Sequence, residues 1–383
     1  MSGTNVPTRT DVIVVGGGIM GAATAFFLRR RGLSVALLER DLVGQKASGT
    51  NFGNVRRQGR FLPQLPLAHR ARAIWGRLPE LIGEDAEFLP SGHLRLAFRE
   101  QDVGILERYQ ADARRWDLEL ELISANALRD RFPFLSTRAV MGSYSPHDGH
   151  ANPRLAAPAF ARAARREGAL VHENTKVVSI AKAGEDFLVE TTAGHFRAPL
   201  VQISAGAWGR AMAAAFGEDV PLTPRGPQMG VTEPLPYRIG PVLGTASTIA
   251  LEGVYLRQVK RGNIVFGGGA RTAVSLDEGL AHVDPLNTLN QLPQLSRLLP
   301  AIAPLAVIRT WSGVEGYIDD DIPVMGPSGK VSGLFYAFGF CGHGFQLGPG
   351  VGETMAQLIA TGEPGVPIAP FAITRFAGRT APA

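Results

Sequence analysis

Three glycines near the N-terminus have the spacing of a phosphate-binding turn. Gly16, Gly18 and Gly21 follow a short apolar run and precede a run of small and apolar residues. In such a motif the first glycine permits a tight turn, the second lets the backbone approach a pyrophosphate, and the third lets a helix pack closely on a strand. The pyrophosphate of a dinucleotide would lie at the helix N-terminus, where unpaired N–H groups and the helix dipole favour an anion.

A carboxylate follows this motif at a distance that suits ribose binding. Glu39 stands 18 residues after Gly21, at the end of the second apolar run of the chain. There it would accept hydrogen bonds from a ribose diol and would disfavour a 2′-phosphate, so the sequence favours FAD or NAD over NADP. An NAD enzyme would be colourless and would leave the glycine-rich segment near the C-terminus without a role.

That second glycine-rich segment, Gly339–Phe345, follows an apolar run and precedes a predicted helix. Its backbone N–H groups would face the electron-rich edge of a flavin ring and stabilise negative charge on the reduced ring. The alternative interpretation is a turn with a purely structural purpose.

The elements that must position these motifs are short buried strands and small-residue helices. Residues 11–15, 22–31 and 35–38 predict a complete strand–helix–strand unit, ended by Gly32 and Glu39. Further predicted strands are 93–98, 169–178, 187–191, 200–204 and 334–338, with alternating strand character over 232–266. Predicted helices are 101–116, one before Pro133, 155–167 with Pro158 in its first turn, and 352–360.

Composition narrows the class of protein. The 383 residues exceed one compact core, so we expect two domains. The single cysteine, Cys341, excludes an internal disulfide and a cysteine-rich metal site, and we expect no metal. The net charge of +5 comes from scattered basic residues without an interleaved aromatic pattern, which argues against nucleic acid. No apolar stretch is long enough to span a bilayer and no secretory pattern is present, so we expect a cytoplasmic protein.

Several ordered motifs together resemble one family of flavoenzymes. Beside the first glycine motif and Glu39, they are Ala47–Asn51, Asp148-Gly149 with Pro153, Ser204–Trp208, Asp321–Gly326 and Gly339–Gly344. The chain resembles, over nearly its whole length, the D-amino-acid-oxidase-like (DAO) family of FAD enzymes. The runs 51–60 and 345–349 look most like the flavoprotein β-subunits of opine, hydroxyproline or sarcosine oxidoreductase complexes.

The resemblance implies a fold that is α/β in its first part and α+β overall. A Rossmann-type FAD-binding domain would comprise residues 1–90, 145–225 and 325–383, and an inserted antiparallel-sheet substrate domain 91–144 and 226–324. It also implies the cofactor-binding residues, which are Gly16, Gly18, Ile19, Met20, Gly21, Glu39, Arg40, Ser48, Gly49, Thr50, Asn51, Val177, Gly206, Trp208, Gly342, His343, Gly344, Phe345 and Gln346.

Oxidation of an amine by flavin requires mainly that the substrate be held with its α C–H over the ring. A substrate carboxylate calls for a planar bidentate donor, and the candidates are Arg56 and Arg257, each of which could instead form a surface salt bridge. His343 would tune the flavin or contact the substrate, or be structural. Glu315 would lie near the flavin, where it attracts a cationic amine or holds a loop through backbone N–H groups.

Two departures from the family's monomeric sarcosine oxidases affect the expected chemistry. Those enzymes attach FAD through a cysteine. The corresponding segment here, Arg309-Thr310-Trp311, has no cysteine, so we expect noncovalent FAD. They also carry a lysine over the flavin that promotes reaction with oxygen, and the corresponding strand, residues 263–267, has none. A quinone, a dye or a partner subunit is therefore the expected electron acceptor.

The predicted function is FAD-dependent oxidation of the C–N bond of an amino acid or secondary amine, by hydride transfer to flavin. The substrate would be an opine, an imino acid or an N-methyl amino acid. Two alternatives stay open. One is a D-amino-acid or glycine oxidase, and the other is a flavoprotein subunit that relays electrons in a hetero-oligomeric complex.

Overall fold

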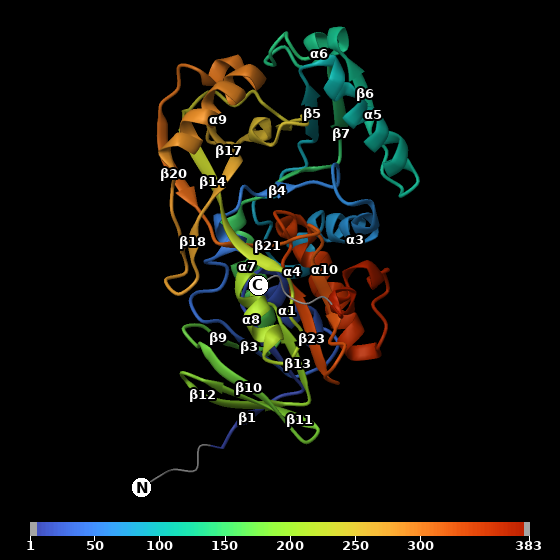
Figure 1. Ribbon diagram of the computed structural model, residues 1–383, viewed down its shortest axis with the longest axis vertical. Coiled ribbons are helices and arrows are strands. Elements are labelled where there is room, and N and C mark those ends of the chain that lie inside the picture. The colour runs from blue at the N-terminus through green and yellow to red at the C-terminus, as the bar shows by residue number, and fades with distance from the viewer. Residues whose placement is uncertain (1–5, 379–383) are drawn as a thin grey trace.

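The computed structural model describes residues 6–378 and contains two large sheets that lie along the long axis of the molecule (Figure 1). A small four-stranded sheet lies at one end, a six-stranded sheet in the middle and a nine-stranded sheet at the other end. Each large sheet collects strands that are far apart in the sequence. The chain therefore crosses between the two regions more than once.

The six-stranded sheet is parallel except at one edge. Its order is β22, β23, β13, β2, β3, β9, and only β22 runs antiparallel to its neighbour. The strands are β2 (Val12–Val15), β3 (Val35–Leu38), β9 (Leu170–His172), β13 (Leu200–Ile203), β22 (Val324–Pro327) and β23 (Leu334–Phe338). Every residue of β2 and β3 is buried, as the unbroken apolar runs predict for parallel strands covered on both faces.

Three helices pack together beside this sheet. Helix α1 (Ile19–Arg29) follows the first glycine motif directly and contacts α7 (Pro153–Arg166) and α10 (Gly344–Thr361). All residues of α1 before Arg29 are buried because helices or strands cover it on every side. A segment from the beginning of the chain and one from its end thus share the same core.

The nine-stranded sheet is antiparallel except for one pair. Its order is β20, β14, β17, β16, β15, β5, β7, β6, with β21 paired to β14, and β15 runs parallel to β5. The strands are β5 (His93–Ala97), β6 (Glu121–Ser124), β7 (Met141–Ser145), β14 (Leu222–Pro234), β15 (Val242–Thr245), β16 (Val254–Gln258), β17 (Asn263–Thr272), β20 (Val307–Ser312) and β21 (Glu315–Ile318). Helices α5 (Glu100–Arg114), α6 (Ala125–Arg131) and α9 (Pro285–Leu298) contact it.

The remaining elements are shorter. The four-stranded sheet comprises β1 (Thr8–Arg9), β12 (Gly194–Ala198), β11 (Asp186–Thr191) and β10 (Val177–Ala183). Two further two-stranded pairs are β4 (Asn54–Val55) with β8 (Gly149–His150) and β18 (Val274–Ser275) with β19 (Leu280–Ala281). The remaining α-helices are α2 (Ala47–Thr50), α3 (Leu65–Trp75), α4 (Leu78–Ile82) and α8 (Gly209–Ala214).

The predicted α/β and antiparallel-sheet architecture is confirmed, and three predicted elements need correction. Residues 169–178 are not one strand, because β9 joins the parallel sheet and β10 joins the small sheet. Helix α7 begins at Pro153, where the Asn152 side chain caps it, so Pro158 lies in its second turn. Helix α10 begins at Gly344, eight residues before the predicted start, and includes Pro349.

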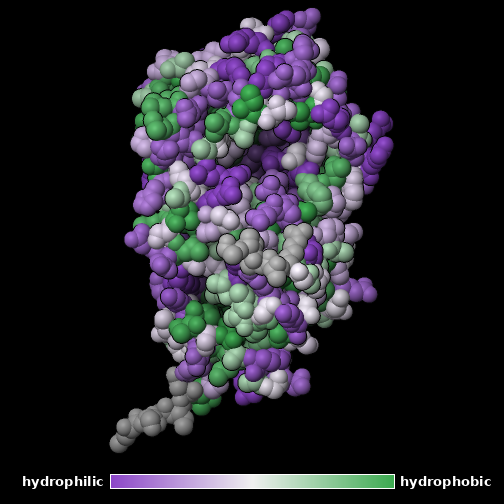
Figure 2. Space-filling view, viewed as in Figure 1, coloured by the Kyte–Doolittle hydropathy of each residue, from purple (hydrophilic) through white to green (hydrophobic). Residues whose placement is uncertain are grey.

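The surface on the face drawn in Figure 2 is mostly hydrophilic, with hydrophobic residues in small separate groups. Its upper part is hollowed. None of the helices in residues 6–378 has the length and apolarity that a bilayer span needs.

Candidate active site

A cavity of about 600 Å³ lies at the carboxyl ends of the parallel strands. The last residues of β2, β3 and β23, which are Val15, Leu38 and Phe338, line it, and so does Ser204 directly after β13. In open α/β sheets this edge is where ligands bind. The opposite wall comes from the nine-stranded sheet, for example Met229 on β14 and Glu315 on β21.

The first glycine motif forms part of this wall, packs closely on neighbouring backbone and presents a free N–H group. A Cβ on Gly16 would stand 2.5 Å from the carbonyl oxygen of Ser204, and one on Gly21 would stand 1.9 Å from that of Gly16. The N–H of Ile19 donates to Ser48 Oγ at 2.9 Å, whereas the Gly18 N–H has no acceptor among the described residues. A free N–H at the start of α1 suits an anion.

Glu39 lies at the end of β3 and is tied to the same turn. Its Oε2 accepts from the Gly17 N–H at 2.6 Å and its Oε1 from the Asp41 N–H at 2.8 Å. Burial raises the pKa of Glu39, while these two N–H groups and Arg40 oppose the rise. Arg40 lies over the ring of Trp208 at 4.3 Å and pairs with Asp41 at 3.1 Å.

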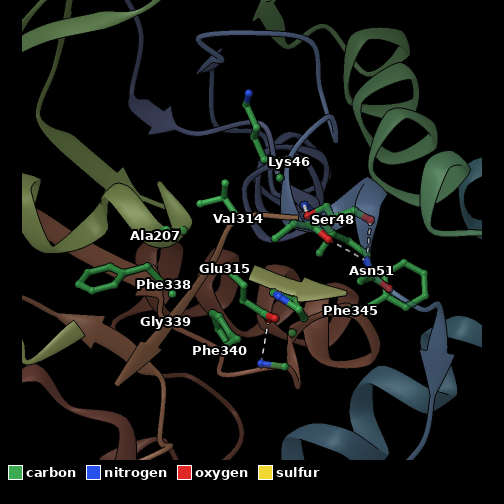
Figure 3. A pocket seen from close by; sticks show the side chains of 18 of the residues that line it. Lys46, Ser48, Asn51, Ala207, Val314, Glu315, Phe338, Gly339, Phe340 and Phe345 are labelled. Carbon is green, nitrogen blue, oxygen red and sulfur yellow. Dashed lines mark hydrogen bonds between the residues drawn. The ribbon is translucent and has the colours of Figure 1, made fainter. Parts of the chain in front are cut away.

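The amide side chain of Asn51 holds the loop after α2. Asn51 Nδ2 donates to the carbonyl oxygens of Ala47 at 2.9 Å and Ser48 at 2.8 Å (Figure 3). Asn51 Oδ1 accepts from the Gly53 N–H at 2.7 Å. These bonds fix the path of the chain between the glycine motif and Arg56.

The second glycine-rich segment reaches the cavity at the start of α10. Gly339, Cys341 and Gly342 all have positive φ, which lets the chain turn sharply between β23 and α10. Burial raises the pKa of the Cys341 thiol to about 12, and its Sγ donates to the Gly339 carbonyl at 3.1 Å. A neutral, enclosed thiol of this kind is a structural group.

Most of the predicted cofactor residues line the cavity. They are Gly16, Gly18, Ile19, Met20, Glu39, Arg40, Ser48, Asn51, Val177, Gly206, Trp208, Gly342, His343, Gly344, Phe345 and Gln346. Gly21, Gly49 and Thr50 do not line it. Gly49 packs on the Gly44 carbonyl, and the Thr50 carbonyl accepts from Trp311 Nε1 at 2.7 Å. The free Gly18 N–H, the glycine cradle and the start of α10 on one cavity fit a dinucleotide that carries a flavin.

Three arginines at this site pair with no carboxylate among the described residues. Arg56 and Arg60 line the cavity from the loop after β4, and Arg271 lines it from β17. Arg56 donates to the Gln58 carbonyl, Arg60 donates to the Arg56 carbonyl at 2.9 Å, and Arg271 lies over the ring of Tyr317 at 4.1 Å. Their charges are therefore available to an anionic ligand.

His343 lies among these arginines and is kept neutral. Its pKa is well below the ordinary value, first because of burial and then because of the charges of Arg56, Arg60 and Arg271. Its Nε2 lies 3.5 Å from Arg56 Nη2 and its Nδ1 lies 3.3 Å from Gln64 Oε1. A neutral ring that donates from Nδ1 and accepts at Nε2 satisfies both contacts.

Glu315 holds the second glycine-rich segment. Its Oε1 accepts from the Gly342 N–H at 2.8 Å (Figure 3). Its Oε2 accepts from the Tyr317 hydroxyl at 3.0 Å. Burial raises the pKa of Glu315, and burial also raises the pKa of Tyr255, another residue of the wall, to about 12. With both oxygens engaged, Glu315 has the geometry of the loop-holding alternative rather than of an amine-binding group.

Arg257 lies outside the cavity wall. Its Nε donates to the Phe52 carbonyl at 2.7 Å, its Nη1 lies 3.0 Å from His150 Nδ1, and its guanidinium packs against Gly53. Burial lowers its pKa to about 10. The side chain thus fixes the loop before Arg56, and the structure does not bring it together with Arg56.

Sequence reasoning missed Arg60, Arg271 and the tyrosines. Tyr255, on β16, stands two residues before Arg257, so strand alternation was the available signal for it. Arg271 follows three glycines at the end of β17, and nothing in its local sequence distinguishes it from a surface arginine. In residues 6–378 no group of three or more His, Cys, Asp or Glu side chains suits a metal ion.

The parallel sheet with its glycine motif and the antiparallel sheet across the cavity have the architecture of an FAD-binding oxidoreductase. A match to the family described as FAD dependent oxidoreductase (DAO) spans residues 11–358, and the chain belongs to that family. It is an FAD-dependent amino acid or amine oxidase or dehydrogenase.

Individual relatives cover nearly the whole chain. Glycine oxidase of Geobacillus kaustophilus is 30% identical, over 97% of this chain and 98% of its own length. Sarcosine oxidase subunit beta of an Arthrobacter species is 28% identical, over 96% and 91%. The crystal structure of L-proline dehydrogenase from P. horikoshii superposes with a TM-score of 0.90 at 26% identity, covering 97% of this chain and 98% of that one.

Proposed function

We propose that this protein oxidises the C–N bond of a secondary amine that carries a carboxylate: an opine, an imino acid or an N-methyl amino acid. The observation that carries the proposal is the position of Arg56 and Arg271, which pair with no carboxylate among the described residues and flank His343 at the start of α10. A planar guanidinium binds a carboxylate through two parallel hydrogen bonds.

The remaining residues orient the reactants. FAD, when bound, supplies the oxidant that takes hydride from the substrate carbon next to nitrogen. Gly16, Gly18 and Glu39 would hold the ADP half, and the N–H groups at the start of α10 would stabilise negative charge on the ring. Glu315 would keep the Gly342 N–H in place, since that N–H already donates to it. A neutral His343 would add no positive charge beside the amine.

FAD would be bound without a covalent bond, and oxygen would be a poor electron acceptor. Cys341 is the single cysteine and its Sγ is buried in the turn, bonded to the Gly339 carbonyl and the Ile318 N–H. The part of β17 that covers the cavity, through Gly268 and Gly269, carries no lysine. A quinone or a partner subunit is the proposed acceptor.

Two other functions predict different behaviour. A glycine or D-amino-acid oxidase, which the likeness to glycine oxidase favours, would be reduced by primary amines and reoxidised quickly by air. An electron-relaying subunit, which the likeness to a sarcosine oxidase β-subunit favours, would show little activity until small partner subunits were added.

The test is the absorption spectrum of the purified protein, recorded anaerobically before and after addition of proline, hydroxyproline, sarcosine, opines, glycine and D-amino acids. We expect flavin bands that precipitation with acid releases into solution, and bleaching by one of the secondary amines. Slow reoxidation in air would support the proposed acceptor. Bleaching by primary amines alone would overturn the substrate class, and a protein that cannot be loaded with FAD would overturn the cofactor assignment.

A further inference from the structure

A second, smaller cavity of about 450 Å³ lies beside the first. One face of α5 and the loop after β4 form its walls together with β5, and its lining residues are Gly59, Arg60, Phe61, Arg95, Ile105, Arg108, Tyr109 and Asp112. The four residues from α5 are spaced three and four apart, so they share one helix face. The proposed oxidation uses none of these residues except Arg60, which lines both cavities.

Arg95 is a half-buried cation without a partner among the described residues. It lies in the middle of β5, and its guanidinium forms no hydrogen bond or ion pair with any described residue. Its Nη1 lies 3.0 Å, and Arg56 Nη1 3.3 Å, from the point where a Cβ on Gly59 would stand. Gly59 therefore leaves space in which two guanidinium groups face each other. Burial and the nearby charge of Arg56 lower the pKa of Arg95 to about 10.

Arg60 adds a buried cation to the same cavity. Arg60 is 4% exposed. Its guanidinium donates hydrogen bonds to two neutral groups, the carbonyls of Arg56 and His343. Tyr109 contributes a hydroxyl that accepts from the Arg60 N–H at 2.8 Å. The only carboxylate in the lining is that of Asp112, whose side chain is exposed and forms no ion pair within the described residues.

Buried charges without counter-charges are strongly unfavourable, and proteins normally pair them or bind an anion beside them. The charges of the buried Arg60, the half-buried Arg95 and the exposed Arg108 outweigh the charge of Asp112. Arginine forks match a carboxylate in shape as well as in charge. The cavity thus has the donors of an anion site.

We propose that this cavity is a second carboxylate-binding site, formed by Arg95 and Arg60 with Arg108 at its rim. The carboxylate is either a second acidic group of the amine substrate, reaching past Arg60 from the first cavity, or a free small carboxylate. The site exists whether or not the protein oxidises secondary amines, because binding at it requires no turnover.

The first experiment measures binding of malonate to the FAD-loaded protein by isothermal titration calorimetry and by thermal unfolding. Arg95→Met removes the unpaired charge, and Arg138→Met is the matched control, since Arg138 is exposed and outside both cavities. We expect Arg95→Met to bind one malonate fewer than wild type and Arg138→Met to bind as wild type. Malonate should raise the Tm of wild type more than that of Arg95→Met.

Two results would overturn the proposal: equal malonate stoichiometry in wild type and Arg95→Met, or binding of inorganic phosphate in the cavity with no binding of malonate. Arg95→Met should fold, because it removes a half-buried charge that pairs with no described residue. If it does not fold, Arg95→Lys replaces it, and we then expect malonate affinity at this site to fall at least tenfold because the fork is lost.

A kinetic measurement identifies the source of the carboxylate. Iminodiacetate and sarcosine differ by one carboxylate, so the ratio of their kcat/KM values reports on a second acidic group. A fall of about tenfold or more in that ratio for Arg95→Met assigns the carboxylate to the substrate. An unchanged ratio with a lost malonate site assigns it to a free carboxylate. Absence of turnover with every amine contradicts the proposed function and leaves the malonate result standing.

Discussion

Arginines that look alike in the sequence have different surroundings in the fold. Arg257 donates to the Phe52 carbonyl and packs on Gly53, so it positions a loop. Arg56 and Arg271 reach the cavity wall and pair with no carboxylate of the described chain. We therefore assign Arg257 to loop positioning, because protein groups already accept its hydrogen bonds. We assign Arg56 and Arg271 to substrate binding, because no carboxylate of the described chain pairs with them.

Arg271→Met tests this division at the residue scale. Loss of a charge-assisted hydrogen bond of about 1.5–3 kcal/mol should lower kcat/KM for the carboxylate substrate by roughly tenfold to a hundredfold, without changing the flavin content. Steady-state kinetics and the flavin absorbance measure both quantities. Arg261→Met, an exposed residue in the turn between β16 and β17, is the control. An equal loss in the two variants would mean that Arg271 does not bind the substrate.

Close packing between elements decides where the cofactor lies. Helix α1 can begin directly after β2 because Gly21 brings the helix against the turn at Gly16, and α10 can begin beside it because Gly339 and Gly342 turn the chain after β23. Both helix starts then line one cavity. Glu39 stabilises the first turn by accepting from the Gly17 N–H, and Glu315 stabilises the second by accepting from the Gly342 N–H.

Gly21→Ala tests the packing of α1 on the glycine turn. The added Cβ would stand 1.9 Å from the Gly16 carbonyl oxygen, so helix and turn must separate. Overpacking of this kind should lower the free energy of unfolding by about 1–3 kcal/mol and weaken FAD binding. Urea unfolding and the fluorescence of released flavin measure these effects. Gly240→Ala, with no atom within 4 Å of its added Cβ, should leave both unchanged. FAD affinity equal to wild type in Gly21→Ala would contradict this account.

Two buried histidines that line neither cavity are kept in uncharged form. His93 lies on β5 and His150 on β8, and burial is the largest cause of a pKa of about 3 for each. Positive neighbours, Arg56 for His93 and Arg257 for His150, lower these pKa values further. Burial of these two rings, reinforced by neighbouring arginines, thus makes the fold sensitive to acid.

Stability should accordingly fall as the pH falls from about 6.5 towards 3. In that interval the unfolded histidines bind protons and the native ones do not, so the unfolded state gains protons and is favoured. Each histidine contributes a slope of up to about 1.4 kcal/mol per pH unit. Urea midpoints measured against pH with FAD in constant excess should show this slope reduced in His93→Gln. The exposed His147→Gln should keep it, and equal slopes in wild type and His93→Gln would refute the assignment.

The sequence by itself determined the local elements and the cofactor motif. Residues 12–15, 19–29 and 35–38 form the predicted strand–helix–strand unit because glycine spacing and unbroken apolar runs act over short distances along the chain. The family resemblance followed from several such motifs in fixed order, and the match over residues 11–358 bears it out.

Only the tertiary structure decided which charged side chains share a cavity. Arg56, Arg271 and His343 come from three distant segments, and the sequence cannot show that Arg257 finds acceptors in the Phe52 loop while Arg95 finds none. Electrostatic environment depends on distances across the fold and on exclusion of water, and neither is encoded in the spacing of neighbouring residues. The start of α10 also depends on the tertiary structure. Its glycines and Pro349 do not favour a helix by themselves, and they are helical because α10 packs against α1 and α3.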